Sequence, residues 1–186
     1  TLERAITNPL PTEVRIAASS ITQNIPGLRM ILSGDGLKTL KLRTNALVEY
    51  FSDSESNQAK IARPFTPDAI VYCKSNVVFI NEADPESILA YAAKEVPAFF
   101  KRHGYLPKVI VIKGIGLVAV GDNAAQCDTI LDVFEDAMKI AYLDGMGDSG
   151  FGAATVETNV RKGYVTECPN AGKFISHLVQ IEHKGE

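Results

Sequence analysis

The sequence has few cysteines and no closely spaced pair of them. Its three cysteines, Cys73, Cys127 and Cys168, are widely separated, and no CxxC spacing occurs in the 186 residues. A scattered, odd set excludes a disulfide framework and a zinc ribbon, because both need paired cysteines. This cysteine usage therefore indicates a reducing compartment.

Long apolar runs and blocks of like charge are absent as well. No run approaches the roughly 18 to 20 apolar residues of a membrane helix, and the chain does not open on a charged start followed by an apolar core. Lys plus Arg number 19 against 22 Asp plus Glu, a net charge of -3, and neither sign forms the block typical of a nucleic-acid or membrane surface. We therefore expect a cytoplasmic protein with no nucleic-acid or membrane partner. Small neutral or anionic metabolites remain as candidate ligands.

What is present is the composition of an ordinary globular protein. Hydrophobic residues make up 46% of the chain and charged residues 22%, a balance that excludes extensive disorder. The length suits one domain with a hydrophobic core. We expect this domain at residues 1–144, followed by an extension at 145–186 whose signals are weak and mixed.

Apolar spacing in the first half of the chain predicts short elements of both kinds. The boundaries come from glycine, proline and polar stretches, which end helices and strands. The expected elements are a helix over 11–24 that ends before Pro26-Gly27, a strand over 28–32, one helical face within 37–51, a polar loop over 52–60, and a hairpin or two successive strands within 69–80.

The second half carries clearer signals. Asp84 is placed to cap a helix that begins with Pro85 and Glu86 and ends at Gly104, and Pro97 is expected to kink it. A second helix is predicted over 122–143, because apolar residues recur there at three- and four-residue intervals. Its acidic face is expected to be solvated: Asp128, Asp132, Glu135 and Asp136.

Two strands and a glycine turn are predicted in VIVIKGIGLVAVGD, residues 109–122. The segment reads G-x-G-x-x-A from Gly114 to Ala119, and a dinucleotide-binding turn would need a helix to begin within the glycines. Here the helix begins only after Asp122, so the glycines join strand to strand. On residue chemistry alone this is a tight connection in which glycine accepts positive φ.

The order of elements from Thr66 to Leu143 resembles the C-terminal half of the class II aldolase/adducin family. It is most similar to the aldolase module of the bifunctional rhamnulose-1-phosphate aldolase/alcohol dehydrogenase branch. The resemblance lies in Thr66-Pro67-Asp68 before an apolar run, and in the strand, glycine turn, strand, glycine and long helix of residues 109–143. It implies a three-layer α/β fold with a mostly antiparallel sheet flanked by helices. A short link between consecutive strands, as at 109–120, favours the same arrangement.

The resemblance also implies a site at the glycine turn, with Lys113, Gly114, Ile115 and Gly116 as substrate-binding candidates. Catalytic members hold zinc with a His-x-His pair and a third histidine in the turn, and this chain has Ile115 at the third position. The His-x-His pair is missing too, because the only histidines are His103, His177 and His183. Isoleucine cannot replace imidazole as a ligand. No catalytic or metal residue is therefore assigned within the chain.

Two functions follow from the resemblance. One is cleavage of a ketose 1-phosphate, such as rhamnulose 1-phosphate, by a homo-oligomer, with zinc held by ligands outside this chain. The other is a non-catalytic, adducin-like binding or scaffold module. Either the chain is part of a longer module, or it is a divergent relative without catalysis.

The remaining polar residues favour structural roles. His103 lies at a predicted helix end, where a basic side chain complements the helix dipole. Cys127 lies on an apolar helix face and is expected to be packed. Cys73, Cys168, His177 and His183 show no pairing in the sequence that indicates a nucleophile or a metal site.

Overall fold

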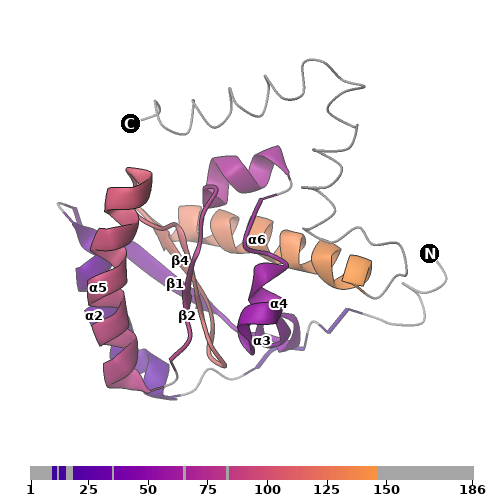
Figure 1. The fold of residues 1–186 in the computed structure, drawn as a ribbon, viewed down its shortest axis with the longest axis horizontal. Helices are drawn as coiled ribbons and strands as arrows, with labels where there is room; N and C mark the ends of the chain where they lie inside the picture. Colours follow the sequence, from indigo (N-terminus) through magenta and orange to yellow (C-terminus); the bar gives the residue numbers. More distant parts are fainter. Residues whose placement is uncertain are drawn as a thin grey trace.

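A four-stranded sheet between two helical layers forms the centre of the molecule (Figure 1). The computed structural model describes residues 10–11, 13–15, 19–34, 36–64, 66–82 and 84–145. The expected extension at 145–186, which ends in a strand-like run over 174–181, lies outside this part except for Gly145, as do Cys168, His177 and His183. The elements are α2 (Ser19–Ser33), β1 (Thr39–Arg43), α3 (Ala46–Ser52), α4 (Glu55–Ala59), the π-helix η1 (Ala69–Cys73), β2 (Val78–Ile80), α5 (Pro85–His103), β3 (Val109–Ile112), β4 (Gly116–Gly121) and α6 (Ala124–Gly145).

The strand order is β1-β4-β3-β2. β4 pairs antiparallel with both β1 and β3, whereas β2 runs parallel to β3. The parallel pair is possible because α5 provides the crossover that parallel neighbours require. The predicted α/β fold with a mostly antiparallel sheet is thus confirmed.

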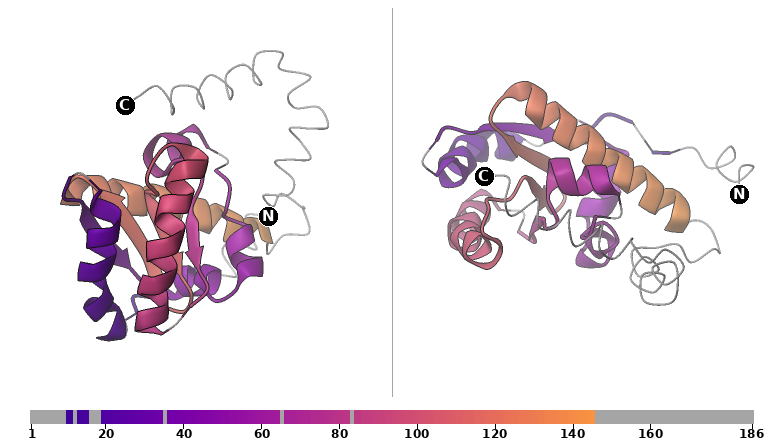
Figure 2. Two further views of the ribbon diagram at one scale, coloured as in Figure 1. Left: turned by 60° about the vertical axis from the view of Figure 1, so that its left-hand side comes forward. Right: turned by 90° about the horizontal axis from the view of Figure 1, so that it is seen from above.

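Alternation along the strands divides the core into two clusters. Ile110, Ile112 and Val118 face α2 and α5, and Val109 and Leu117 face α3 and α6. Figure 2 shows α2 and α5 side by side on one face of the sheet and α6 on the other. None of the helices that the structure describes is long and apolar enough to cross a lipid bilayer.

The best-predicted helix is α5, since its ends carry local signals. The Asp84 side chain accepts a hydrogen bond from the Ser87 amide at 3.1 Å, Pro85 opens the helix, and Gly104 closes it with φ of 79°. Strands β3 and β4 and helix α6 also lie where the sequence predicts them. Pro97 lies inside α5 as expected.

Removing the Asp84 cap should destabilise the protein modestly. Asp84→Ala loses the acceptor for the Ser87 amide and should lower the free energy of unfolding by about 1 kcal/mol. Asp84→Asn keeps an oxygen acceptor and should retain most of that stability. Urea unfolding of both variants measures the difference, and equal losses would show that the cap hydrogen bond contributes nothing.

The predicted strand over 28–32 is wrong, because these residues belong to α2. Leu28 and Leu32 are both fully buried, whereas Met30 between them is 81% exposed, which is helical and not strand periodicity. The predicted stop at Pro26-Gly27 is wrong as well. Gly27 instead allows α2 to approach α5, since a Cβ there would lie 2.8 Å from a methyl carbon of Leu89.

The apolar run at 69–73 is a π-helix and not the first strand of a hairpin. Ala69 and Cys73 are buried, whereas Val71 and Tyr72 are exposed. The Thr66 hydroxyl accepts a hydrogen bond from the Ala69 amide at 3.2 Å at the start of this turn. β2 therefore pairs with β3 and not with residues 69–73.

Residues 37–60 hold more regular structure than predicted. The expected helical face within 37–51 divides into strand β1 and helix α3, which begins after the cap residue Asn45. The expected loop at 52–60 contains helix α4, whose cap residue Ser54 accepts a hydrogen bond from the Asn57 amide at 3.3 Å. Serine and asparagine caps make such short helices possible where apolar spacing is weak.

Candidate functional site

The turn between β3 and β4 is a tight strand connection. The Ile115 amide donates to the Ile112 carbonyl at 3.1 Å, and Gly114 and Gly116 have φ of 63° and 150°. Two further bonds hold the turn in place, from Lys113 N–H to the Ile80 carbonyl at 2.9 Å and from Gly114 N–H to the Ser52 carbonyl at 3.3 Å. The strand-to-strand interpretation is therefore confirmed, because α6 begins only after β4.

Ile115 is a core residue. Its side chain is 7% exposed and belongs to the cluster that includes Ile80 and Ile112 on the α5 side of the sheet. It offers no donor atom to a metal, so the turn does not fit the zinc ion that the family resemblance implies. Among the residues that the structure describes, no three His, Cys, Asp or Glu side chains converge on a metal position.

Gly116, at the end of the turn, packs closely against the end of β1. A Cβ at this position would lie 2.6 Å from the Arg43 carbonyl oxygen and 3.4 Å from Cβ of Thr44. Only glycine allows the two backbones to come this close. The turn therefore lies directly against the segment that ends β1.

That same segment borders an open surface hollow of about 530 Å³. The lining combines two guanidinium groups, one carboxylate, a hydroxyl and an amide with a few apolar carbons, a mixture that suits a small polar ligand. The residues are Val14, Arg15, Leu42, Arg43, Thr44, Asn45 and Glu135. We treat the glycine turn and this hollow together as the candidate site.

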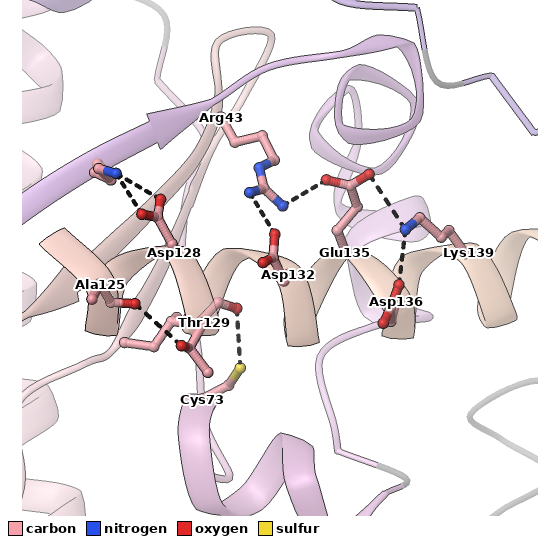
Figure 3. Close-up of polar contacts among 11 residues, drawn as sticks. Arg43, Cys73, Ala125, Asp128, Thr129, Asp132, Glu135, Asp136 and Lys139 are labelled. Atoms are coloured by element: carbon pink, nitrogen blue, oxygen red, sulfur yellow. Dashed lines mark hydrogen bonds and ion pairs between the residues drawn. The ribbon is translucent and has the colours of Figure 1, made fainter.

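Arg43, which lines the hollow, contacts two carboxylates of α6 (Figure 3). Its guanidinium donates to Asp132 at 2.7 Å and to Glu135 at 2.9 Å. Burial by itself would lower the pKa of Arg43, but the hydrogen bonds to the two carboxylates outweigh burial and raise the pKa. Arg43 is therefore permanently charged and fixed in orientation.

The acidic face of α6 is solvated as expected at Asp128, Asp132 and Asp136, whose side chains are 50%, 66% and 68% exposed, but not at Glu135, whose side chain is 11% exposed. All four carboxylates form ion pairs, which the sequence-based expectation did not include. Lys41 of β1 contacts both carboxylate oxygens of Asp128 at 2.6 and 2.7 Å. Glu135 is also 3.7 Å from Lys139, which pairs with Asp136 at 2.8 Å. A row of ion pairs thus joins edge strand β1 to α6.

The sequence contained a signal for this row. In TLKLR, residues 39–43, Lys41 and Arg43 alternate with leucines, so both cations lie on one face of the strand. Asp128 and Asp132 are four residues apart and therefore lie on one side of α6. The patterns match in sign and spacing, but they indicate a contact only once β1 is known to lie beside α6.

Loss of Arg43 should cost more stability than loss of Lys41. Arg43→Met leaves Glu135, whose side chain is 11% exposed, without its guanidinium partner, and should cost about 1 to 2 kcal/mol. Lys41→Met removes a more exposed ion pair and should cost less than about 1 kcal/mol. Urea unfolding tests the order, and a larger loss for Lys41→Met would contradict the assigned roles.

The other polar candidates lie elsewhere. His103 contacts Asn76 at 3.3 Å and packs against Phe99 and Tyr105 at the end of α5, which agrees with a structural role. Cys127 is fully buried, as expected. Burial raises the pKa of Cys73 to about 12, so this thiol is not a nucleophile at neutral pH.

Solved structures share this fold, whereas the sequence comparisons find no match. No family model matches the chain, and no curated protein matches it. YgbL from Klebsiella pneumoniae, a candidate aldolase/epimerase/decarboxylase, superposes with a TM-score of 0.53 at 13% identity, over 75% of this chain and 64% of its own. YgbL from Escherichia coli, with the same description, gives a TM-score of 0.50 at the same identity and coverage. The chain thus shares its fold with these two proteins and spans less than two thirds of their length.

Proposed function

We propose that the chain is a class II aldolase-like module of sugar-phosphate metabolism, with its ligand in the hollow beside the glycine turn. The observation that carries the proposal is the contact of Gly116 with residues 42–44, which line the hollow. The turn singled out by its resemblance to aldolases thus adjoins a polar hollow in a fold shared with candidate aldolases. The proposed reaction is cleavage of a ketose 1-phosphate into a triose phosphate and an aldehyde.

The residues of the hollow suit binding and orientation of such a substrate. Arg15 is half-exposed and holds Glu49 only loosely at 3.4 Å, so it can exchange this partner for a phosphoryl group, which guanidinium recognises well. The carboxylate of Glu135 and the hydroxyl of Thr44 can hydrogen-bond to sugar hydroxyls. We assign recognition to these residues.

Charge stabilisation in the reaction is not assigned to this chain. Retro-aldol cleavage leaves an enediolate, whose negative charge needs an electrophilic partner. Ile115 cannot hold a metal, so the proposal requires ligands from outside the described residues. We further propose that the protein works as a homo-oligomer.

The direct test is an assay of the protein encoded by the complete reading frame. Rhamnulose 1-phosphate and fuculose 1-phosphate are supplied with Zn²⁺, and triose phosphate is followed by coupled oxidation of NADH. The proposal predicts triose phosphate, and Arg15→Met should raise KM more than it lowers kcat. No product from either sugar, with an active control aldolase in the same buffer, would contradict the proposal.

The second candidate is a non-catalytic, adducin-like binding module, which the burial of Ile115 favours. The complete reading frame of the gene distinguishes between the two proposed functions. A His-x-His pair encoded upstream of Thr1 supports the lyase, whereas a start codon next to Thr1 removes the metal-dependent reaction.

A further inference from the structure

We propose that the opposite end of the sheet binds a phosphate-like oxyanion through Lys108, flanked by Lys38 and Lys74. This site lies at the far end of β3 and β4 from the glycine turn. Nothing in the proposed lyase activity requires it.

The topology places the three lysines at the same end of the sheet. β2 and β3 run parallel and β1 and β3 both pair antiparallel with β4, so β1, β2 and β3 all begin where β4 ends. Lys38 immediately precedes β1, and Lys108 immediately precedes β3. Lys74 begins the loop between η1 and β2. Residues 38, 74 and 108, far apart in the sequence, thus lie at the same end of the sheet, with Lys108 before inner strand β3 and Lys38 and Lys74 before the two edge strands.

Local contacts fix these positions. The carbonyl of Lys108 accepts the Val120 amide at 2.9 Å. Lys38 pairs with Asp122 at 2.6 Å, just beyond β4. The ammonium of Lys74 lies over the Tyr105 ring, 5.4 Å from its centre.

Lys108 differs from the other lysines of the sheet. It is half-buried, and among the described residues no carboxylate lies within ion-pair distance of its ammonium, whereas Lys38 and Lys41 each contact an aspartate at 2.6 Å. Burial lowers the pKa of Lys108, and the nearby charges of Lys38 and Lys74 lower it further, against the opposing effect of Asp122. A half-buried cation among like charges is an electrostatic cost that a bound anion would relieve.

The acidic and dipolar groups nearby are compatible with an anion. Asp122 is already held by Lys38, whose hydrogen bond lowers the pKa of this carboxyl. α6 begins at Ala124, two residues later, so its positive dipole end adds to the lysine field. A dianion with several oxygens can contact more than one ammonium at once.

The test titrates the full 186-residue chain with inorganic phosphate and with glycerol 3-phosphate at constant ionic strength. Amide shifts in two-dimensional NMR locate binding, and calorimetry measures Kd. We expect shifts around residues 38, 74, 108 and 122, and not around 42–45. The absence of phosphate binding, or shifts confined to the hollow at 42–45, would overturn the inference without bearing on the lyase assay.

Matched variants distinguish phosphate binding at a specific site from nonspecific attraction to the positive charges of the protein. Lys108→Gln should weaken binding at least about 10-fold, as expected for one charge-assisted hydrogen bond, whereas Lys94→Gln on the exposed face of α5 should change Kd less than 2-fold. Asp122→Asn should tighten binding, because it frees Lys38. Equal effects of the Lys108 and Lys94 variants, or weaker binding in Asp122→Asn, would contradict the site. Stronger binding of glycerol 3-phosphate identifies a phosphate monoester as the ligand, and equal binding identifies the free ion; both support the site.

Discussion

Gly116→Ala is expected to destabilise the protein by about 3 to 4 kcal/mol, because two costs add at this position. The residue has φ of 150°, a conformation that side chains rarely adopt. A methyl group there would also lie 2.6 Å from the Arg43 carbonyl oxygen and 3.3 Å from a methyl carbon of Leu42. Backbone atoms of a paired strand cannot move away cheaply, so β1 must separate from the turn. The same change should disturb the hollow beside Arg43.

Two other glycines provide the controls, and urea unfolding is the measurement. Gly114 has φ of 63° but open space around its Cβ position, so Gly114→Ala should cost only the left-handed penalty of about 1 to 2 kcal/mol. Gly36 has open space and no positive φ, so Gly36→Ala should fall within about 0.5 kcal/mol of the parent. A loss at Gly116 no larger than at Gly114 would show that the contact with β1 is unimportant.

Ile115→His is expected to lower the free energy of unfolding by about 2 to 3 kcal/mol. The substitution places an imidazole at the position where the family resemblance implies a metal ligand. The surroundings are the apolar side chains of the α5-side core, including Ile80, Ile112 and Val118, so the ring nitrogens would lose water without gaining partners. Chemical denaturation measures the loss.

Ile115→Val is the matched control, because it keeps the apolar character and removes one methylene. It should cost about 1 kcal/mol. Zinc added at equimolar concentration should not restore the stability of Ile115→His, since one imidazole cannot hold the ion by itself. Recovery of stability with zinc would reveal further ligands near the turn and contradict the assignment of Ile115 to the core.

Elements with signals at both ends could be predicted from the sequence. α5 has an aspartate cap, a proline start and a glycine end, and the β3–β4 hairpin has two buried strands around glycines. In these segments the local propensity and the tertiary packing agree. The predictions at 28–32 and 69–73 were wrong because a short apolar run suits a buried strand and a buried helical turn equally. Only the burial pattern of Leu28, Met30 and Leu32 distinguishes them.

The candidate site was predictable only in part. The glycine turn was singled out by its residues, and the structure places it against the end of β1 as part of the site. The contact between Arg43 and Glu135 was missed, because the two residues lie 92 residues apart in sequence and come together only through the pairing of β1 with β4. Ile115 was singled out in the sequence as an apolar residue at the position of the implied ligand, but its packing in the core follows only from the sheet.

The most direct test of the central claim, that the glycine turn is a packed core element and not a metal site, is the zinc content of the purified 186-residue chain. Elemental analysis by mass spectrometry follows incubation with excess Zn²⁺ and removal of free metal on a desalting column. The account predicts well under one zinc per chain, and the same value for a variant in which Ile115 is changed to valine. One equivalent of zinc per chain, released with loss of stability by a chelator, would contradict it.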